Sequence, residues 1–211
     1  MINILPFNHF EVNCSVVFDQ TKECVLVDVC CQSEKERKEL LDYIKSNDLK
    51  VKHILLTHAH IDHICGSGWI TKEFNLPLEL HKDGNQMIRI VDAQAEMMGF
   101  NVEGIEDVKF KYITKDDKIK YGESELIVFE TPGHCAGSVC FYNENEGFVI
   151  TGDVLFQNSI GRTDLPSGNF DVLMKSIKEN LFPLPEKTVC VCGHGPTTTI
   201  GYEKENNPFI N

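Results

Sequence analysis

The feature that most constrains this chain is the hexapeptide His-Ala-His-Ile-Asp-His at residues 58–63, in which four potential metal ligands lie close together. It follows Val51–Thr57, an apolar run that we predict to be a buried strand. Sites are usually built on loops at strand ends, because the scaffold beneath them is rigid. Imidazoles suit a borderline cation such as zinc, and a nearby carboxylate adds neutralising charge. The hexapeptide therefore predicts a metal site at the end of this strand.

Three further polar residues each follow a predicted strand and are each preceded by glycine. They are His134, Asp153 and His194. A preceding glycine frees the backbone to turn the next side chain inward. Together with the hexapeptide they give the candidate ligand set, which is His58, His60, Asp62, His63, His134, Asp153 and His194.

The order of predicted elements suggests two halves, each made of a sheet and helices. Apolar runs at 14–18 and 24–29 predict a hairpin, and Ser33 with Glu36 has the capping-box pattern of a helix start. Further helices are predicted at about 66–74, 83–98 and 170–181. Further strands are predicted at 78–80, 118–121, 126–130, 138–142, 148–151 and 188–192. We expect the halves to pack together as one compact domain over residues 1–211.

One predicted helix carries an apolar stripe. The segment 83–98 places Met87, Ile90, Val91 and Met98 at helical spacing. Such a stripe is typical of a protein core or a pocket wall. We therefore expect these side chains to pack rather than to bind a cofactor.

Charge and hydropathy narrow the classes of partner. Twenty basic and 32 acidic side chains give a formal net charge of −12, and the basic cluster Lys35–Lys38 is interleaved with glutamates. This balance disfavours a nucleic-acid partner. No apolar run approaches the roughly 18 residues needed to span a bilayer, and residues 1–10 lack the pattern of a signal peptide. We expect a cytoplasmic protein with no membrane partner.

The nine cysteines fit the same compartment. Their number is odd and no Cys-x-x-Cys occurs, so we expect reduced thiols that act mostly as small buried hydrophobes. Cys65 and Cys135 lie beside predicted ligands, where a thiolate could coordinate metal or sense oxidation. The ligand set is already full without them.

The motifs resemble those of the metallo-β-lactamase superfamily over nearly the whole chain. The quoted matches are Thr57-His58, Thr131–His134, Thr151–Asp153 and Cys192–Pro196, which follow the family's order of a His-x-His-x-Asp-His stretch and then single His, Asp and His. Within the superfamily, Gly161–Asp164 and Asn207–Phe209 look most like single-domain glyoxalase II-type hydrolases. The resemblance implies an α+β fold, a four-layer αββα sandwich of two packed mixed β-sheets flanked by helices, with a two-metal site along one edge.

The resemblance also implies a ligand assignment. Two divalent ions would be held, zinc by resemblance, with iron or manganese as alternatives. One ion would be bound by His58, His60 and His134, and the other by Asp62, His63 and His194. Asp153 would bridge the ions together with a water or hydroxide. Asp62 and Asp153 are the implied catalytic residues. The chemistry agrees, because two cations a few Å apart stabilise hydroxide at neutral pH and then the oxyanion formed by its attack.

The implied reaction is attack of the bridging hydroxide on the carbonyl of an S-(hydroxy)acyl thioester such as S-lactoylglutathione. A thiolate leaves without a strong general acid. Two residues argue against antibiotic hydrolysis. Resemblance to true β-lactamases would imply Cys or His near position 153, where this chain has Asp153. It would often imply Arg at position 63, where this chain has His63.

The substrate contacts are less constrained. Gly161–Asp164 resembles the glutathione-contact segment Gly-Lys-Phe-Tyr of glyoxalase II, whose helical C-terminal domain is not expected here. Arg162 could bind a substrate carboxylate bidentately, or it could form an ion pair with Asp164 that fixes the loop. Asp164 adds negative charge in place of a hydroxyl. The expected partner is a small anionic thioester, with glutathione as a candidate thiol. Asp28 does not bind the metal in this interpretation but is expected to orient a metal ligand through a hydrogen bond.

Several other functions remain open. A persulfide dioxygenase shares the Gly161–Asp164 pattern and would use a single iron held by His58, His134 and Asp153, although Cys192–Pro196 fits the hydrolases better. A lactonase, a phosphodiesterase or a nuclease is less well supported, the last two because there is no basic patch. A metal-depleted binding protein is disfavoured because every ligand position is filled.

Overall fold

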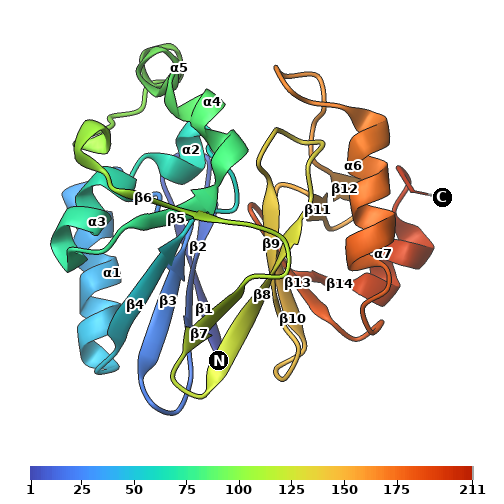
Figure 1. The fold of residues 1–211 in the computed structure, drawn as a ribbon, viewed down its shortest axis with the longest axis horizontal. Helices are drawn as coiled ribbons and strands as arrows, with labels where there is room; N and C mark the ends of the chain where they lie inside the picture. The colour runs from blue at the N-terminus through green and yellow to red at the C-terminus, as the bar shows by residue number, and fades with distance from the viewer. Residues whose placement is uncertain (211) are drawn as a thin grey trace.

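Two six-stranded β-sheets pack face to face in the computed structural model, which describes residues 1–210, and helices cover the outer face of each sheet (Figure 1). Both sheets are mixed, with parallel and antiparallel neighbours. The expected αββα sandwich is confirmed. That residues 1–211 form a single domain stays a prediction.

The first sheet comes from the N-terminal half of the chain. Its strands, in spatial order, are β1 (Ile2–Phe7), β2 (Val12–Phe18), β3 (Glu23–Val27), β4 (Lys50–Leu55), β5 (Leu78–His81) and β6 (Phe110–Ile113). The first three strands are antiparallel, as the predicted hairpin requires, and β3 to β6 are parallel. Parallel neighbours need helical crossovers, and these cover the outer face.

The second sheet comes from the C-terminal half. Its strands, in spatial order, are β14 (Thr198–Thr199), β13 (Val189–Cys192), β10 (Phe148–Gly152), β9 (Val139–Asn143), β8 (Ser124–Glu130) and β7 (Lys118–Tyr121). Only β10 and β13 are parallel to each other. A short ribbon of β11 (Leu155–Phe156) and β12 (Ser159–Ile160) follows β10.

Helices fall into two groups, one for each outer face. The first group is α1 (Glu34–Ser46), α2 (Ile61–Ile64), α3 (Ser67–Phe74), α4 (Asn85–Ile88) and α5 (Val91–Met98). The second group is α6 (Phe170–Ser176), which continues as a π-helical turn at Ile177–Leu181, and α7 (Ile200–Asn206). The predicted capping box at Ser33 and Glu36 is present at the start of α1. Among the described residues, no helix combines the length and the apolarity that crossing a bilayer requires.

Successive side chains of a strand point to opposite faces of its sheet, so each strand contributes to two layers of the core. In β3, Val25 and Val27 face the second sheet, whereas Cys24 and Leu26 face the helices of the first group. Because both faces are covered, the strand reads as a continuous apolar run. The core between the sheets also holds Phe141 from β9.

One expectation about local structure is wrong, and two edge strands of the first sheet were not predicted. The predicted helix at 83–98 is broken into a 3-10 turn, α4 and α5, with Ile90 at φ −115° and ψ 12° between the helices. The break lets each short helix bury its own apolar residues, Met87 in α4 and Val91 in α5. Strands β1 and β6 were not predicted, because their partly exposed residues do not form a long apolar run.

Candidate metal centre

The seven candidate ligands lie together where the two sheets meet. His58 and His60 follow β4, and the short helix α2 carries Asp62 and His63. His134, Asp153 and His194 follow β8, β10 and β13 respectively. The Val139 amide of β9 donates to the Thr57 carbonyl after β4 at 2.9 Å, so the two sheets are joined at this edge. Strand ends and the short helix α2 therefore position the seven candidates.

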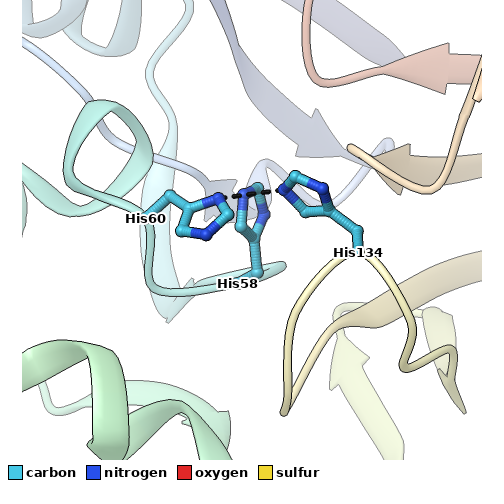
Figure 2. Close-up of side chains that lie close together, drawn as sticks. All are labelled: His58, His60 and His134. Atoms are coloured by element: carbon cyan, nitrogen blue, oxygen red, sulfur yellow. Dashed lines mark hydrogen bonds between the residues drawn. The ribbon is translucent and has the colours of Figure 1, made fainter. Parts of the chain in front are cut away.

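Three histidines form the first group, which we name the imidazole triad: His58, His60 and His134. Their rings turn toward one another from two separate loops (Figure 2). His134 Nε2 lies 2.9 Å from His60 Nδ1. One nitrogen from each ring lies within 4.8 Å of the others, which is the spacing that a shared ion requires.

The second group, which we name the carboxylate triad, contains Asp62, His63 and His194. His194 Nε2 lies 3.2 Å from Asp62 Oδ2 and 3.3 Å from His63 Nε2. The three ligand atoms again lie within 4.8 Å of one another. A carboxylate and two imidazoles are a common donor set for a borderline divalent cation.

Asp153 lies between the two triads. Its Oδ1 is 3.4 Å from His63 Nε2, and its Oδ2 is 3.7 Å from His134 Nε2. Within residues 1–210, Asp153 Oδ1 and His58 Nε2 are buried without a hydrogen-bond partner. Such orphaned atoms are uncommon in a protein interior and need a partner that the side chains do not supply. A pair of cations satisfies both atoms, so the donor set fits two metal ions.

The second ring nitrogen of most ligand histidines is held by a hydrogen bond. His63 Nδ1 lies 3.0 Å from Asp28 Oδ2, and His134 and His194 each place Nδ1 2.8 Å from a backbone carbonyl. These carbonyls belong to Arg162 and Phe10. Such contacts fix the tautomer and the orientation of a ligating imidazole, so that Nε2 faces the metal.

Two glycines allow the close packing of the centre. Gly152 has φ 48°, and a Cβ atom there would lie 2.6 Å from Thr57 Oγ1. A Cβ atom at Gly193 would lie 2.1 Å from Asp153 Oδ1. Any larger residue at either position would displace a ligand or its support. The glycines next to the predicted ligands thus provide space as well as a turn.

The two triads differ in their protonation. Burial lowers the pKa of His58 well below its usual value, and burial together with His134 lowers the pKa of His60 to about 4. Burial also disfavours the charged form of His194, but hydrogen bonds to Asp153 and Asp62 outweigh it and raise its pKa to about 9. The pKa of His63 is also raised well above its usual value, because nearby carboxylates outweigh the effect of its burial.

The two carboxylates respond in the opposite sense. Burial favours the neutral form of Asp62 and of Asp153, but the neighbouring His63 and His194 lower both pKa values. Asp62 and Asp153 are therefore ionised at neutral pH, which is the form that binds a cation.

Comparison with known proteins agrees with the geometry. The family model described as the metallo-beta-lactamase superfamily matches residues 8–194. The chain belongs to the metallo-β-lactamase superfamily. The matched region contains all seven candidate ligands, and the enzymes of this superfamily are metallohydrolases.

Among relatives, the chain is 32% identical to the hydroxyacylglutathione hydrolase GloC of Haemophilus influenzae over 100% of this chain and 98% of that protein. It is similar to a crystal structure of the BLEG-1 B3 metallo-beta-lactamase, with 34% identity, a TM-score of 0.88 and complete coverage of both chains. It is also similar to TTHA1623 in a di-iron-bound form, with 31% identity and a TM-score of 0.87 over 98% of this chain and 99% of that one. Zinc at this site stays a prediction.

Of the two predicted substrate residues, Arg162 lies beside the centre. Arg162 lines a cavity of about 480 Å³ that opens onto the candidate ligands. Its Nε and Nη2 atoms donate to Asp164 at 2.8 and 2.7 Å, so the ion pair left open by the sequence is present. The pairing lowers the pKa of Asp164 to about 2. Binding of a substrate carboxylate by Arg162 stays a prediction.

All nine cysteines are free and buried, as expected. Burial raises the pKa of Cys65 to about 12 and that of Cys135 to about 11. Thiols with such pKa values are poor nucleophiles and poor ligands at neutral pH. Neither cysteine belongs to a candidate ligand group in the described chain.

Sequence reasoning missed two supporting residues of this superfamily member. Thr57 donates from its amide and its hydroxyl to Asp28, at 2.7 and 2.6 Å, and its Oγ1 lies 3.0 Å from His58 Nδ1. Its place directly before His58 was the available signal. Phe10 supports His194 through a backbone carbonyl, for which no side-chain pattern exists.

Proposed function

We propose that this superfamily member is a binuclear metallohydrolase that cleaves an S-acyl thioester, and that S-lactoylglutathione is the first substrate to test. The observation that carries the proposal concerns proton donors in the cavity. Among the described residues that line it, every titratable side chain except Arg162 belongs to the candidate metal centre: His60, Asp62, His134, Asp153 and His194.

The shortage of a free proton donor favours one class of substrate. An amine leaving group must be protonated by a positioned acid as it departs. A thiol has a pKa near 8.5, so a thiolate leaves at neutral pH without that help. Arg162 cannot serve as the acid because a guanidinium keeps its proton. A thioester is therefore the carbonyl substrate that best matches these side chains.

The roles of the residues follow from their positions. When bound, a pair of divalent cations would polarise a carbonyl and lower the pKa of water. The imidazole triad and the carboxylate triad would hold one ion each, and Asp153 would contact both. Asp28 and the carbonyls of Phe10 and Arg162 keep the ligand rings in place. The chain thus contributes a fixed donor set, and little reorganisation accompanies the reaction.

Two other reactions are natural competitors. The structural relative BLEG-1 is described as a B3 metallo-beta-lactamase, which makes a β-lactam amide one competing substrate. The Gly161–Asp164 pattern makes glutathione persulfide another. The absence of a free acid among the described lining residues counts against the amide, and two complete triads count against a single-iron centre. The nine unpaired thiols support a reducing compartment such as the cytoplasm.

The test is a substrate panel on protein of measured metal content. S-lactoylglutathione, a neutral acyl thioester, a β-lactam, a lactone, a phosphodiester and glutathione persulfide are compared, with chelated protein as the control. We expect thiol release from a thioester at kcat/KM of about 10⁴ M⁻¹s⁻¹ or more, within the usual enzyme range. One iron per chain with oxygen uptake on persulfide overturns the proposal, and so does faster turnover of the β-lactam.

A further inference from the structure

The cavity beside the metal centre has a second wall that the proposed reaction does not use. Four side chains form it, and we name them the α4–α5 wall: Met87, Ile90, Met97 and Met98. They come from α4, from α5 and from the break between these helices. Phe10 and Leu165 also line the cavity. The space next to the reacting centre is therefore bordered mainly by hydrocarbon and thioether groups.

Three of the apolar side chains that line the cavity are exposed, although Met87 is buried. Met97 is 79% exposed, Ile90 is 44% exposed and Phe10 is 40% exposed. Large apolar side chains that gather around one cavity are typical of a binding surface rather than of a folding core. Methionine in particular adapts its shape to a bound apolar group. The α4–α5 wall is suited to receive such a group.

The same cavity offers few charges to an ionic substrate. Outside the candidate metal centre, Arg162 is the one charged residue among the described lining residues. Its Nε and Nη2 atoms already donate to the two carboxylate oxygens of Asp164. Glutathione carries two carboxylates and an ammonium group, and burying unpaired charges is costly. The cavity thus matches an apolar group better than a glutathionyl group.

We propose that the α4–α5 wall binds the apolar acyl chain of the substrate, so that this protein prefers extended aliphatic acyl thioesters to S-lactoylglutathione. The inference rests on the proposed thioester hydrolysis. The cavity is continuous with His60 and Asp153, and a chain lying on the wall would therefore hold its carbonyl at the metal centre. Its volume of about 480 Å³ leaves room for several carbon atoms beside the thioester.

The first measurement is a chain-length series on one uncharged thiol. Acetyl, butanoyl, hexanoyl and octanoyl thioesters of N-acetylcysteamine are compared with S-lactoylglutathione, using metal-replete protein. We expect kcat/KM to rise by up to about fourfold for each added methylene, the equivalent of about 0.8 kcal/mol. A flat series, or faster turnover of S-lactoylglutathione than of every acyl homologue, overturns the inference.

The second measurement separates this inference from the proposed function. S-butyl, S-hexyl and S-octyl thioethers of N-acetylcysteamine cannot be hydrolysed, and calorimetry gives their Kd with metal-free protein. We expect Kd to fall with chain length by the same factor. If no thioester is cleaved, the proposed function fails, whereas thioethers that bind without dependence on chain length contradict the inference itself.

A matched pair of substitutions locates the effect. Ile90→Gln changes a half-exposed aliphatic residue of the wall, whereas Val172→Gln changes one of similar exposure, 39%, in α6 outside the cavity. Ile90→Gln is expected to reduce the chain-length dependence, and addition of Met97→Gln to reduce it further, at least severalfold in total, whereas Val172→Gln is expected to retain it. Both changed wall residues are exposed, so circular dichroism is expected to show an intact fold. An unchanged chain-length dependence in the wall variant overturns the inference.

Discussion

The imidazole triad and the carboxylate triad contain histidines of the same kind in opposite protonation states. Burial holds the pKa of His58 and His60 low, whereas carboxylates raise the pKa of His63 and His194 despite their burial. The imidazole triad is therefore neutral and ready to bind a cation at pH 7. The carboxylate triad of the metal-free protein holds protons where a cation would otherwise lie.

This difference shows that the positions of nearby carboxylates, rather than the number of histidines, determine whether the histidines of each triad are protonated. His63 has three carboxylates near it, those of Asp28, Asp62 and Asp153. His60 has a histidine as its nearest partner, since His134 Nε2 lies 2.9 Å from its Nδ1. Asp153 lies close to both groups, 3.4 Å from His63 Nε2 and 3.7 Å from His134 Nε2.

The largest expected effect comes from removing the shared anion. Asp153→Asn keeps the shape of the side chain but deletes the charge between the triads. We expect loss of the paired metal centre and with it several kcal/mol of transition-state stabilisation. At about 1.4 kcal/mol for each tenfold change, this corresponds to a fall of about 10³-fold in kcat/KM. Steady-state kinetics and elemental metal analysis measure both quantities.

Asp171→Asn is the matched control for this change. Asp171 is exposed in the first turn of α6, so the same change of chemistry there is expected to leave metal content and kcat/KM unchanged. Full activity of Asp153→Asn with both ions retained would show that the triads function independently and that the shared contact is incidental.

A smaller effect is expected from Asp28, which contacts only the carboxylate triad. Asp28→Asn replaces the anion that accepts from His63 Nδ1, and the left-handed backbone at φ 53° accommodates asparagine well. We expect metal affinity at the carboxylate triad to fall by about 10- to 100-fold. The imidazole triad is expected to lose less affinity, because Asp28 reaches His58 only through Thr57. Competition with a chromogenic chelator measures the two affinities, and equal losses at both triads would contradict the comparison.

The sequence predicted the ligands more completely than their supports. A cluster at 58–63 and polar residues after strands mark the centre because coordination requires particular side chains. The carbonyl of Phe10 and the break at Ile90 leave no such mark, since any residue has a carbonyl and the break depends on packing. Strands β1 and β6 were missed because sheet pairing, rather than local apolarity, forms them. Sequence patterns thus identify candidate ligand side chains more readily than the backbone contacts that hold these side chains in place.

The smallest expected effect is a count of protons. His194, with a pKa of about 9, is charged in the metal-free protein at pH 7.5, whereas His60, with a pKa of about 4, is neutral. A ligating imidazole must be neutral, so loading the carboxylate triad is expected to release at least one proton and loading the imidazole triad none. Calorimetry of metal binding in buffers of different ionisation enthalpy gives the count.

Two glutamine variants make the count specific to a triad. His194→Gln is expected to lower proton release by about one, whereas His60→Gln weakens binding at the other triad without changing the protons released at the carboxylate triad.

The raised pKa of His194 also makes the stability of the metal-free protein depend on pH. Because folding raises this pKa from 6.5 to about 9, protonation of His194 stabilises the metal-free fold fully below pH 6.5. That contribution is lost as the pH rises through about 9. Thermal unfolding of metal-free protein should therefore show a decline in Tm over this range that is smaller in His194→Gln, where, of the two carboxylate-triad histidines, only His63 still has a raised pKa. Equal declines in both proteins would mean that the carboxylates do not hold the proton on His194.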